Sequence, residues 1–142
     1  MRHDRLANGY VPDFDLDAEV GRQAELYVAS IADALRDGTV EVKADEKARR
    51  TGNVFIEYEC FRQGEWRRSG IATTAAEVWA IVVAGEVMIA APSRMVRHVA
   101  RYSRPHERRE CMRGSHPTRG VVIPMGEFLQ RLAQVPTVEA AA

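Results

Sequence analysis

Only two cysteines occur in the sequence, Cys60 and Cys111, and neither has a partner at the spacing of a recurrent zinc motif. So few cysteines fit a reducing compartment. No apolar run reaches the length of about 18 residues that a membrane-spanning helix needs. The first 15 residues also lack the apolar core of a secretory signal. These absences predict a cytoplasmic protein with no membrane partner.

Net charge is also absent, but the charged residues are divided unevenly along the chain. Residues 1–59 hold 8 Lys and Arg against 13 Asp and Glu, whereas residues 60–142 hold 12 against 7. The basic excess is concentrated in residues 94–119, where eight arginines and three histidines stand against two glutamates. An acidic half beside a basic half suits a protein that acts on a phosphate backbone. The alternative is a charged surface that only contacts water.

The length of 142 residues fits one domain with a real hydrophobic core. We predict an N-terminal arm over residues 1–14, a single domain over residues 15–134 and a frayed tail over residues 135–142. Hydrophobic periodicity and turn residues predict the elements of the domain. They are a helix over 15–38, strands over 40–45, 54–61, 65–68, 78–83 and 87–90, a helix over 92–102, a mobile loop over 103–119, a strand over 121–123 and a helix over 126–133. This order predicts an α/β protein with one mixed central sheet flanked by helices.

The two strands within residues 39–61 place charged side chains where strands seldom have them. Glu41, Lys43 and Asp45 alternate with apolar residues in the first strand, as Glu57 and Glu59 do in the second. Alternate residues of a strand point to the same face, so pairing of the two strands would bring both charged rows together. Carboxylates this close repel one another unless a cation lies among them, and Mg²⁺ takes carboxylate oxygens as ligands. The pattern predicts a divalent metal site.

The string KAD…TGNVFIEYE…SGIATTAAEVW, preceded by a helix that bears a glutamate, resembles the PD-(D/E)XK nuclease superfamily, and in particular its small phage-type members. The resemblance covers somewhat under half of the chain and implies a restriction-endonuclease-like core. It implies that Asp45 is the metal-binding aspartate, Glu57 the first acid of the (D/E)xK pair and Glu25 the glutamate of the first helix. Glu59 stands where the superfamily usually has lysine. Lys43, on the face of Asp45, offers an ammonium group in its place.

A rival alignment takes Glu41 and Lys43 as the (D/E)xK pair and Asp37 as the aspartate. Only three residues separate Asp37 from Glu41, which is too few for a turn between two strands. We rank this alignment second.

The resemblance implies hydrolysis of a phosphodiester in DNA. Asp45 and Glu57 would hold Mg²⁺, or Mn²⁺ in its place, with Glu25 contributing directly or through water. The metal polarises the scissile phosphate and lowers the pKa of a bound water. Glu59 or Lys43 would orient or deprotonate that water, or Lys43 would neutralise charge that builds on the phosphorane.

Side chains with hydrogen-bond donors follow the acidic strands and are the predicted contacts to DNA. They are Arg67, Arg68, Ser69, Thr73, Thr74, Arg94 and Arg97. Turn and cap roles are the alternative for the three hydroxyl residues. Trp66 and Trp79 are predicted to pack in the protein and not to stack on bases.

Three hypotheses remain open. The first is a Mg²⁺-dependent DNA endonuclease, for which cleavage of both strands suggests a homodimer. The second is a protein of the same fold whose catalytic site has decayed and which binds DNA or assists phage assembly; the absence of a lysine after Tyr58 favours it. The third is a protein-binding module whose acidic patch meets a basic partner.

Overall fold

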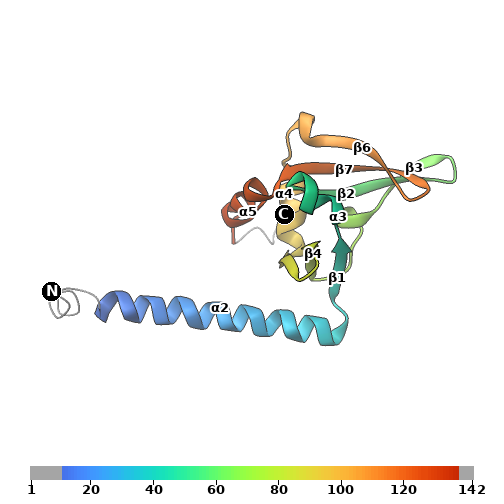
Figure 1. Cartoon of the computed structure of the whole chain (residues 1–142). Coiled ribbons are helices and arrows are strands. Elements are labelled where there is room, and N and C mark those ends of the chain that lie inside the picture. The colour runs from blue at the N-terminus through green and yellow to red at the C-terminus, as the bar shows by residue number, and fades with distance from the viewer. Residues whose placement is uncertain (1–10, 138–142) are drawn as a thin grey trace. The chain divides into compact units, whose positions relative to one another are not determined.

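The computed structural model describes residues 11–137 (Figure 1). These residues divide into two compact units, one that ends at Asp37 and one that begins at Gly38. The boundary falls inside the single domain predicted over residues 15–134. Most of the predicted arm and tail, residues 1–10 and 138–142, lies outside the described residues.

The described residues form a mixed α/β protein with four α-helices and two sheets. The helices are α2 (Val11–Asp37), α3 (Glu46–Thr51), α4 (Ser93–Arg101) and α5 (Met125–Gln134). The strands are β1 (Val40–Ala44), β2 (Asn53–Arg62), β3 (Glu65–Arg68), β4 (Val78–Ala84), β5 (Val87–Pro92), β6 (Arg108–Arg113) and β7 (His116–Pro124). Two short 3-10 helices, η2 (Gly70–Ala72) and η3 (Pro105–Glu107), complete the order. No helix in residues 11–137 is long and apolar enough to cross a membrane.

The strands divide between a three-stranded sheet in the order β1-β4-β5 and a four-stranded sheet in the order β3-β2-β7-β6. β1 runs parallel to β4, with Val40 opposite Val78, and all other pairs are antiparallel. The prediction of one central sheet is therefore wrong. The two charged strands, β1 and β2, are not hydrogen-bonded neighbours, because each lies in a different sheet.

The sequence predicts no element between the strands over 40–45 and 54–61, but the connection between β1 and β2 is the helix α3. Its ends carry ordinary capping signals. The Asp45 side chain accepts a hydrogen bond from the Ala48 backbone N–H, and Gly52 ends the helix with φ of 74°. An aspartate cap and a glycine in the left-handed region stabilise even a helix of six residues.

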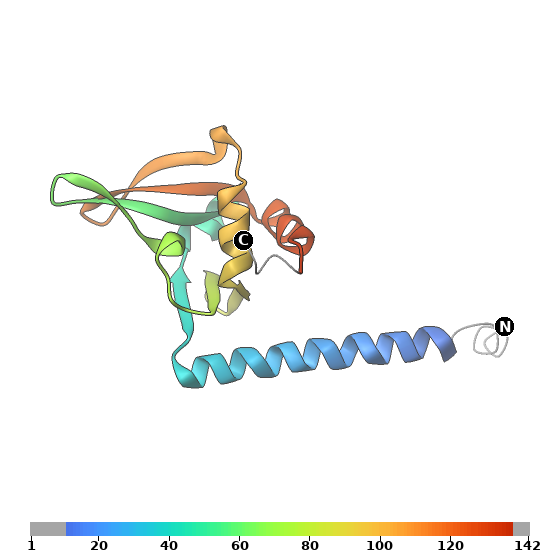
Figure 2. The same ribbon diagram turned by 180° about the vertical axis from the view of Figure 1, so that it is seen from behind.

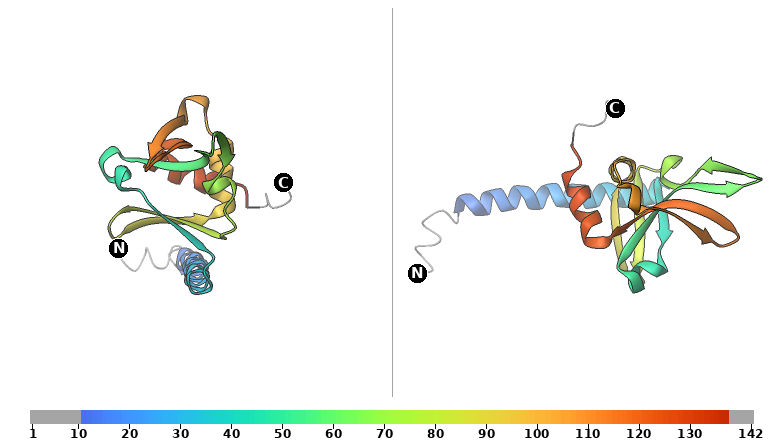
Figure 3. Two further views of the ribbon diagram at one scale, coloured as in Figure 1. Left: turned by 90° about the vertical axis from the view of Figure 1, so that its right-hand side faces the viewer. Right: turned by 90° about the horizontal axis from the view of Figure 1, so that it is seen from above.

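The prediction of a mobile loop over residues 103–119 is wrong as well. Most of this segment forms η3, β6 and the first part of β7. β6 and β7 make a hairpin that pairs Arg108 with Val121 and Arg113 with His116. β6 is an edge strand, and edge strands tolerate charged side chains such as its arginines. Because of these arginines, β6 lacks the apolar alternation by which strands are predicted. The tips of the β2–β3 and β6–β7 hairpins lie at the same end of the sheet (Figures 1 and 3).

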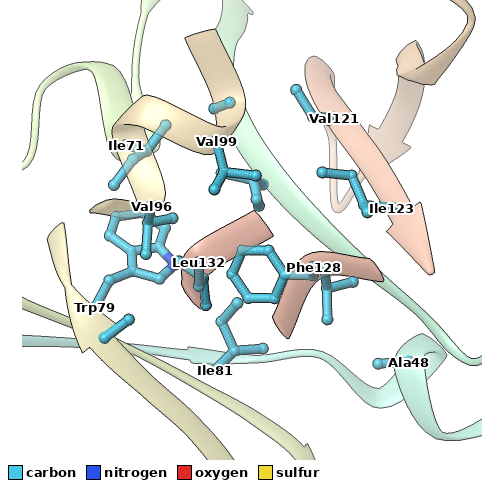
Figure 4. Close-up of a cluster of buried hydrophobic side chains, with 14 of the residues drawn as sticks. Ala48, Ile71, Trp79, Ile81, Val96, Val99, Val121, Ile123, Phe128 and Leu132 are labelled. Atoms are coloured by element: carbon cyan, nitrogen blue, oxygen red, sulfur yellow. The ribbon is translucent and has the colours of Figure 1, made fainter. Parts of the chain in front are cut away.

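The core of the unit from Gly38 on lies where β4, α4 and α5 meet the four-stranded sheet. Trp79 of β4, 1% exposed, packs here, as predicted. Figure 4 shows Phe128 and Leu132 of α5 meeting Ile81 of β4 in this cluster. In Figure 2, α4 is seen in front of the strands. Val135 is also buried, so the prediction that the chain frays from residue 135 is wrong at that residue.

Candidate functional site

Asp45, the predicted metal-binding aspartate, is 4% exposed and holds three elements together. Its Oδ1 accepts a hydrogen bond from the backbone N–H of Ala48 at 3.2 Å. Its Oδ2 accepts one from the backbone N–H of Phe55 at 3.1 Å. The carboxylate therefore joins the end of β1 to the start of α3 and to β2, which is a structural role that needs no metal.

Glu41 and Lys43 share one face of β1, as predicted, but this face is the more buried one. Val42 on the other face is exposed. Lys43 Nζ lies 2.5 Å from Glu41 Oε1 and 5.1 Å from the ring centre of Trp79. Thr74 Oγ1 donates a hydrogen bond to Glu41 Oε2. Burial raises the pKa of Glu41, but the hydrogen bonds from Lys43 and Thr74 outweigh it and leave that pKa below its usual value.

Glu57 and Glu59 lie on either side of a β-bulge, because the pairing of β2 with β7 shifts register between them. Glu57 Oε1 accepts a hydrogen bond from Ser69 Oγ at 2.7 Å. Glu59 Oε2 lies 3.2 Å from Nη1 of Arg119 on β7. Each glutamate thus has its own partner on a neighbouring segment.

A metal site needs several donor side chains close to one another. Within residues 11–137, no three His, Cys, Asp or Glu side chains gather closely enough to hold a metal ion. Asp45 and Glu57 have hydrogen-bond donors of the chain itself on their oxygens, and Glu25 lies on α2, in the other unit. Asp45 and Glu57 have no third acid gathered with them in the described residues, and the predicted Mg²⁺ or Mn²⁺ site with its ligand set stays a prediction.

A group of arginines gathers elsewhere, around a cavity of about 360 Å³. Four arginines from three elements line it: Arg68 at the end of β3, Arg97 and Arg101 on α4, and Arg108 at the start of β6. Arg97 and Arg101 are four residues apart and so lie on one face of their helix. We call this cavity the arginine pocket.

The remaining lining of the arginine pocket is apolar or aromatic. Tyr58 comes from the bulge of β2, Ile71 and Ala72 from η2, and Ala100 from α4. Tyr58 also packs against the hydrophobic core. The lining of the pocket therefore combines four cationic side chains with aromatic and aliphatic ones.

The segment from Ser69 to Thr74 is fastened in place from two sides, and this shapes the pocket. Gly70 has φ of 55°, and a Cβ at this position would overlap the backbone carbonyl oxygen of Glu57. The Ser69 N–H bonds to the carbonyl oxygen of Tyr58 at 2.9 Å. From the other side, Arg97 donates to the carbonyl oxygens of Ile71 and Thr74 at 3.2 and 3.4 Å.

The electrostatics of the pocket are one-sided. Within the part of the chain that the structure describes, no carboxylate pairs with any of the four arginines, and no Asp or Glu lines the cavity. Three of them are oriented by neutral oxygens instead, Arg97 by the carbonyl groups of Ile71 and Thr74. Arg68 donates to the Ala72 carbonyl at 3.0 Å, and Arg108 donates to Ser103 Oγ and the Arg101 carbonyl at 3.1 and 3.2 Å. Such bonds fix a guanidinium group without neutralising it.

The seven predicted DNA contacts separate into two groups. Only Arg68 and Arg97 line the arginine pocket. Arg67 forms an ion pair with Glu65 at 2.7 Å, and Arg94 borders a different cavity. The three hydroxyl residues hold the chain together: Ser69 bonds to Glu57, Thr73 to the Gly70 carbonyl, and Thr74 to Glu41.

Three pocket residues were not predicted from the sequence: Tyr58, Arg101 and Arg108. The i, i+4 spacing of Arg97 and Arg101 was a signal that the two share a surface. Nothing in the sequence indicates that Tyr58 and Arg108 join them, because β2 and β6 reach α4 only through the tertiary fold.

Comparison with known proteins finds no family model, no curated protein and no solved structure that matches this chain.

Proposed function

We propose that the protein binds DNA, and that the arginine pocket receives its phosphate groups. The single observation that carries this proposal is the gathering of four arginines around one cavity, unpaired with carboxylates in the described residues. Guanidinium groups bind phosphate oxygens through paired N–H donors, which makes arginine the usual residue for this purpose. Four like charges on one cavity repel one another, and an anionic ligand relieves that repulsion.

Other arginines of the chain support this reading by contrast. Arg131 is bound by both Glu107 and Glu127, and Arg119 lies between Glu59 and Glu110. The charges of these two arginines are compensated by carboxylates within the fold. The four arginines of the pocket have no carboxylate partner in the described residues. Glu57 lies next to the pocket residue Tyr58 in the chain, but it accepts a hydrogen bond from Ser69 and pairs with none of these arginines.

The proposal is tested by fluorescence anisotropy of a labelled DNA oligonucleotide at low salt. Arg101→Gln removes one pocket charge and should weaken binding about tenfold or more, because a hydrogen bond to a charged group contributes about 1.5–3 kcal/mol. Arg67→Gln is the matched control, since Arg67 precedes Arg68 in β3 but is paired with Glu65. It should change affinity little. Equal losses in the two variants, or no binding by the wild type, would contradict the proposal.

A second candidate function is the metal-dependent nuclease, with the restriction-endonuclease-like core, that the resemblance implies. The observation that favours it is the position of the SGIATT segment. Ser69 bonds to Glu57, Thr74 bonds to Glu41, and Ala72 between them lines the arginine pocket. One short segment thus connects the acids of β1 and β2 to the phosphate-binding surface. A homodimer and a cytoplasmic location remain part of this proposal, the latter supported by two free cysteines.

Incubation of supercoiled plasmid with the protein and Mg²⁺ or Mn²⁺ tests the nuclease. Glu57→Gln keeps the size of the side chain and an acceptor for Ser69, so the fold should stay intact. It removes the negative charge that would hold the metal, so cleavage should be abolished. Glu65→Gln, an exposed glutamate of β3, is the control and should cleave normally. If the wild type retards the plasmid without cutting it, the protein is a binding module alone.

A further inference from the structure

Two kinds of side chain line the arginine pocket. We call Arg68, Arg97, Arg101 and Arg108 its charged zone. We call Tyr58, Ile71, Ala72 and Ala100 its apolar zone, and none of the three aliphatic side chains carries a polar group. A site for a bare phosphate would need only the first zone.

The volume of the cavity also exceeds what an inorganic anion needs. At about 360 Å³ it falls in the range of about 300–1,000 Å³ that is typical of sites for small organic molecules. A ligand that fills both zones must join a flat, largely apolar group to at least one anionic group. A nucleotide has these properties, since its base stacks on aromatic rings and arginines while its phosphate takes the guanidinium donors.

Resting on the DNA-binding function proposed above, we infer that the arginine pocket takes up one unstacked nucleotide of single-stranded DNA. The base lies over Tyr58 and Ala72 in the apolar zone, and the flanking phosphates contact the arginines.

Duplex DNA cannot use the pocket in this way. Its bases are paired and stacked, and removing one from the stack costs free energy, whereas a single strand presents bases that are already free to turn outward. A duplex can still contact the arginines with its phosphates. The inference therefore predicts binding of both forms, with a preference for the single strand.

Competition between a single-stranded oligonucleotide and a duplex of equal length, followed by anisotropy, tests this inference. The wild type should prefer the single strand by about tenfold, within the range expected for stacking of one base. Ala72→Leu fills the apolar zone and leaves all four arginines, so it should remove the preference and keep duplex affinity. Ala133→Leu is the matched control, because it makes the same substitution at an exposed residue of α5 that does not line the pocket, and it should retain the preference.

Each other outcome has a definite meaning. Equal affinity of the wild type for both forms, or a preference that survives Ala72→Leu, overturns the inference but leaves DNA binding in place. Failure to bind either form overturns DNA binding itself. Displacement of the oligonucleotide by micromolar thymidine monophosphate would assign the pocket to a free nucleotide and overturn the assignment to a strand.

Discussion

Asp45 shows how one residue can fit a catalytic pattern and still serve the fold. Its two carboxylate oxygens accept the backbone N–H groups of Ala48 and Phe55, so it caps α3 and connects that helix to β2. A buried N–H that loses its acceptor costs free energy, because no water replaces the lost bond. The same position would have to supply a free oxygen to a metal if the nuclease prediction holds.

Substitution of Asp45 separates these two roles. Asp45→Ala removes both hydrogen bonds and should lower the free energy of unfolding by about 2–3 kcal/mol. Asp45→Asn keeps one acceptor oxygen, which serves only one of the two N–H groups. Its free energy of unfolding should therefore fall by roughly half as much. Urea denaturation measures both variants. An Asp45→Ala protein as stable as the wild type would show that this carboxylate is free for other chemistry.

At the scale of elements, the sequence predicted single helices and strands better than it predicted which strands pair. β2, β4, β5, α4 and α5 agree with their alternation, apolar runs and helical spacing. α3 was missed because its six residues are too short and too polar for a periodic signal, and β6 because its arginines obscure the alternation. Which strands pair was not predictable, since β1 lies next to β4, far along the chain, and not next to β2.

A buried ion pair holds the segment directly before Arg108, a residue that lines the pocket. Glu107 of η3 is 5% exposed and receives two hydrogen bonds from Arg131 of α5, at 2.9 and 2.7 Å. The Arg104 N–H adds a third at 2.7 Å. These contacts join η3 to α5 directly before Arg108, the pocket residue that opens β6.

The hydrogen bonds from Arg131 outweigh burial and lower the pKa of Glu107 to about 2. Because the folded-state pKa lies below the unfolded value, the pair stabilises the protein above pH about 4.5 and loses its contribution as pH falls toward 2. Glu107→Gln should therefore cost about 3 kcal/mol at pH 7. Denaturation series at several pH values should show the difference from wild type shrinking below pH about 4.5. A difference that is constant from pH 7 to pH 2.5 would argue against this pair.

At the scale of the whole molecule, the sequence indicated the charge but not its location. The basic excess of residues 94–119 supplies Arg97, Arg101 and Arg108 of the pocket, and Arg68 comes from β3. Their convergence depends on packing between segments that are distant in the chain. The acids of residues 39–61 were expected to converge, yet the fold gives each of them a separate partner.

The salt dependence of DNA binding tests the central claim most directly. Each phosphate held by an arginine adds about 0.7–0.9 to the slope of log association constant against log salt concentration. Between about 50 and 200 mM salt, the double variant Arg68→Gln/Arg101→Gln should bind with a slope shallower than wild type by about 1.5, and Arg67→Gln with an unchanged slope. A double variant that keeps the wild-type slope would contradict the claim that the arginine pocket receives the phosphates.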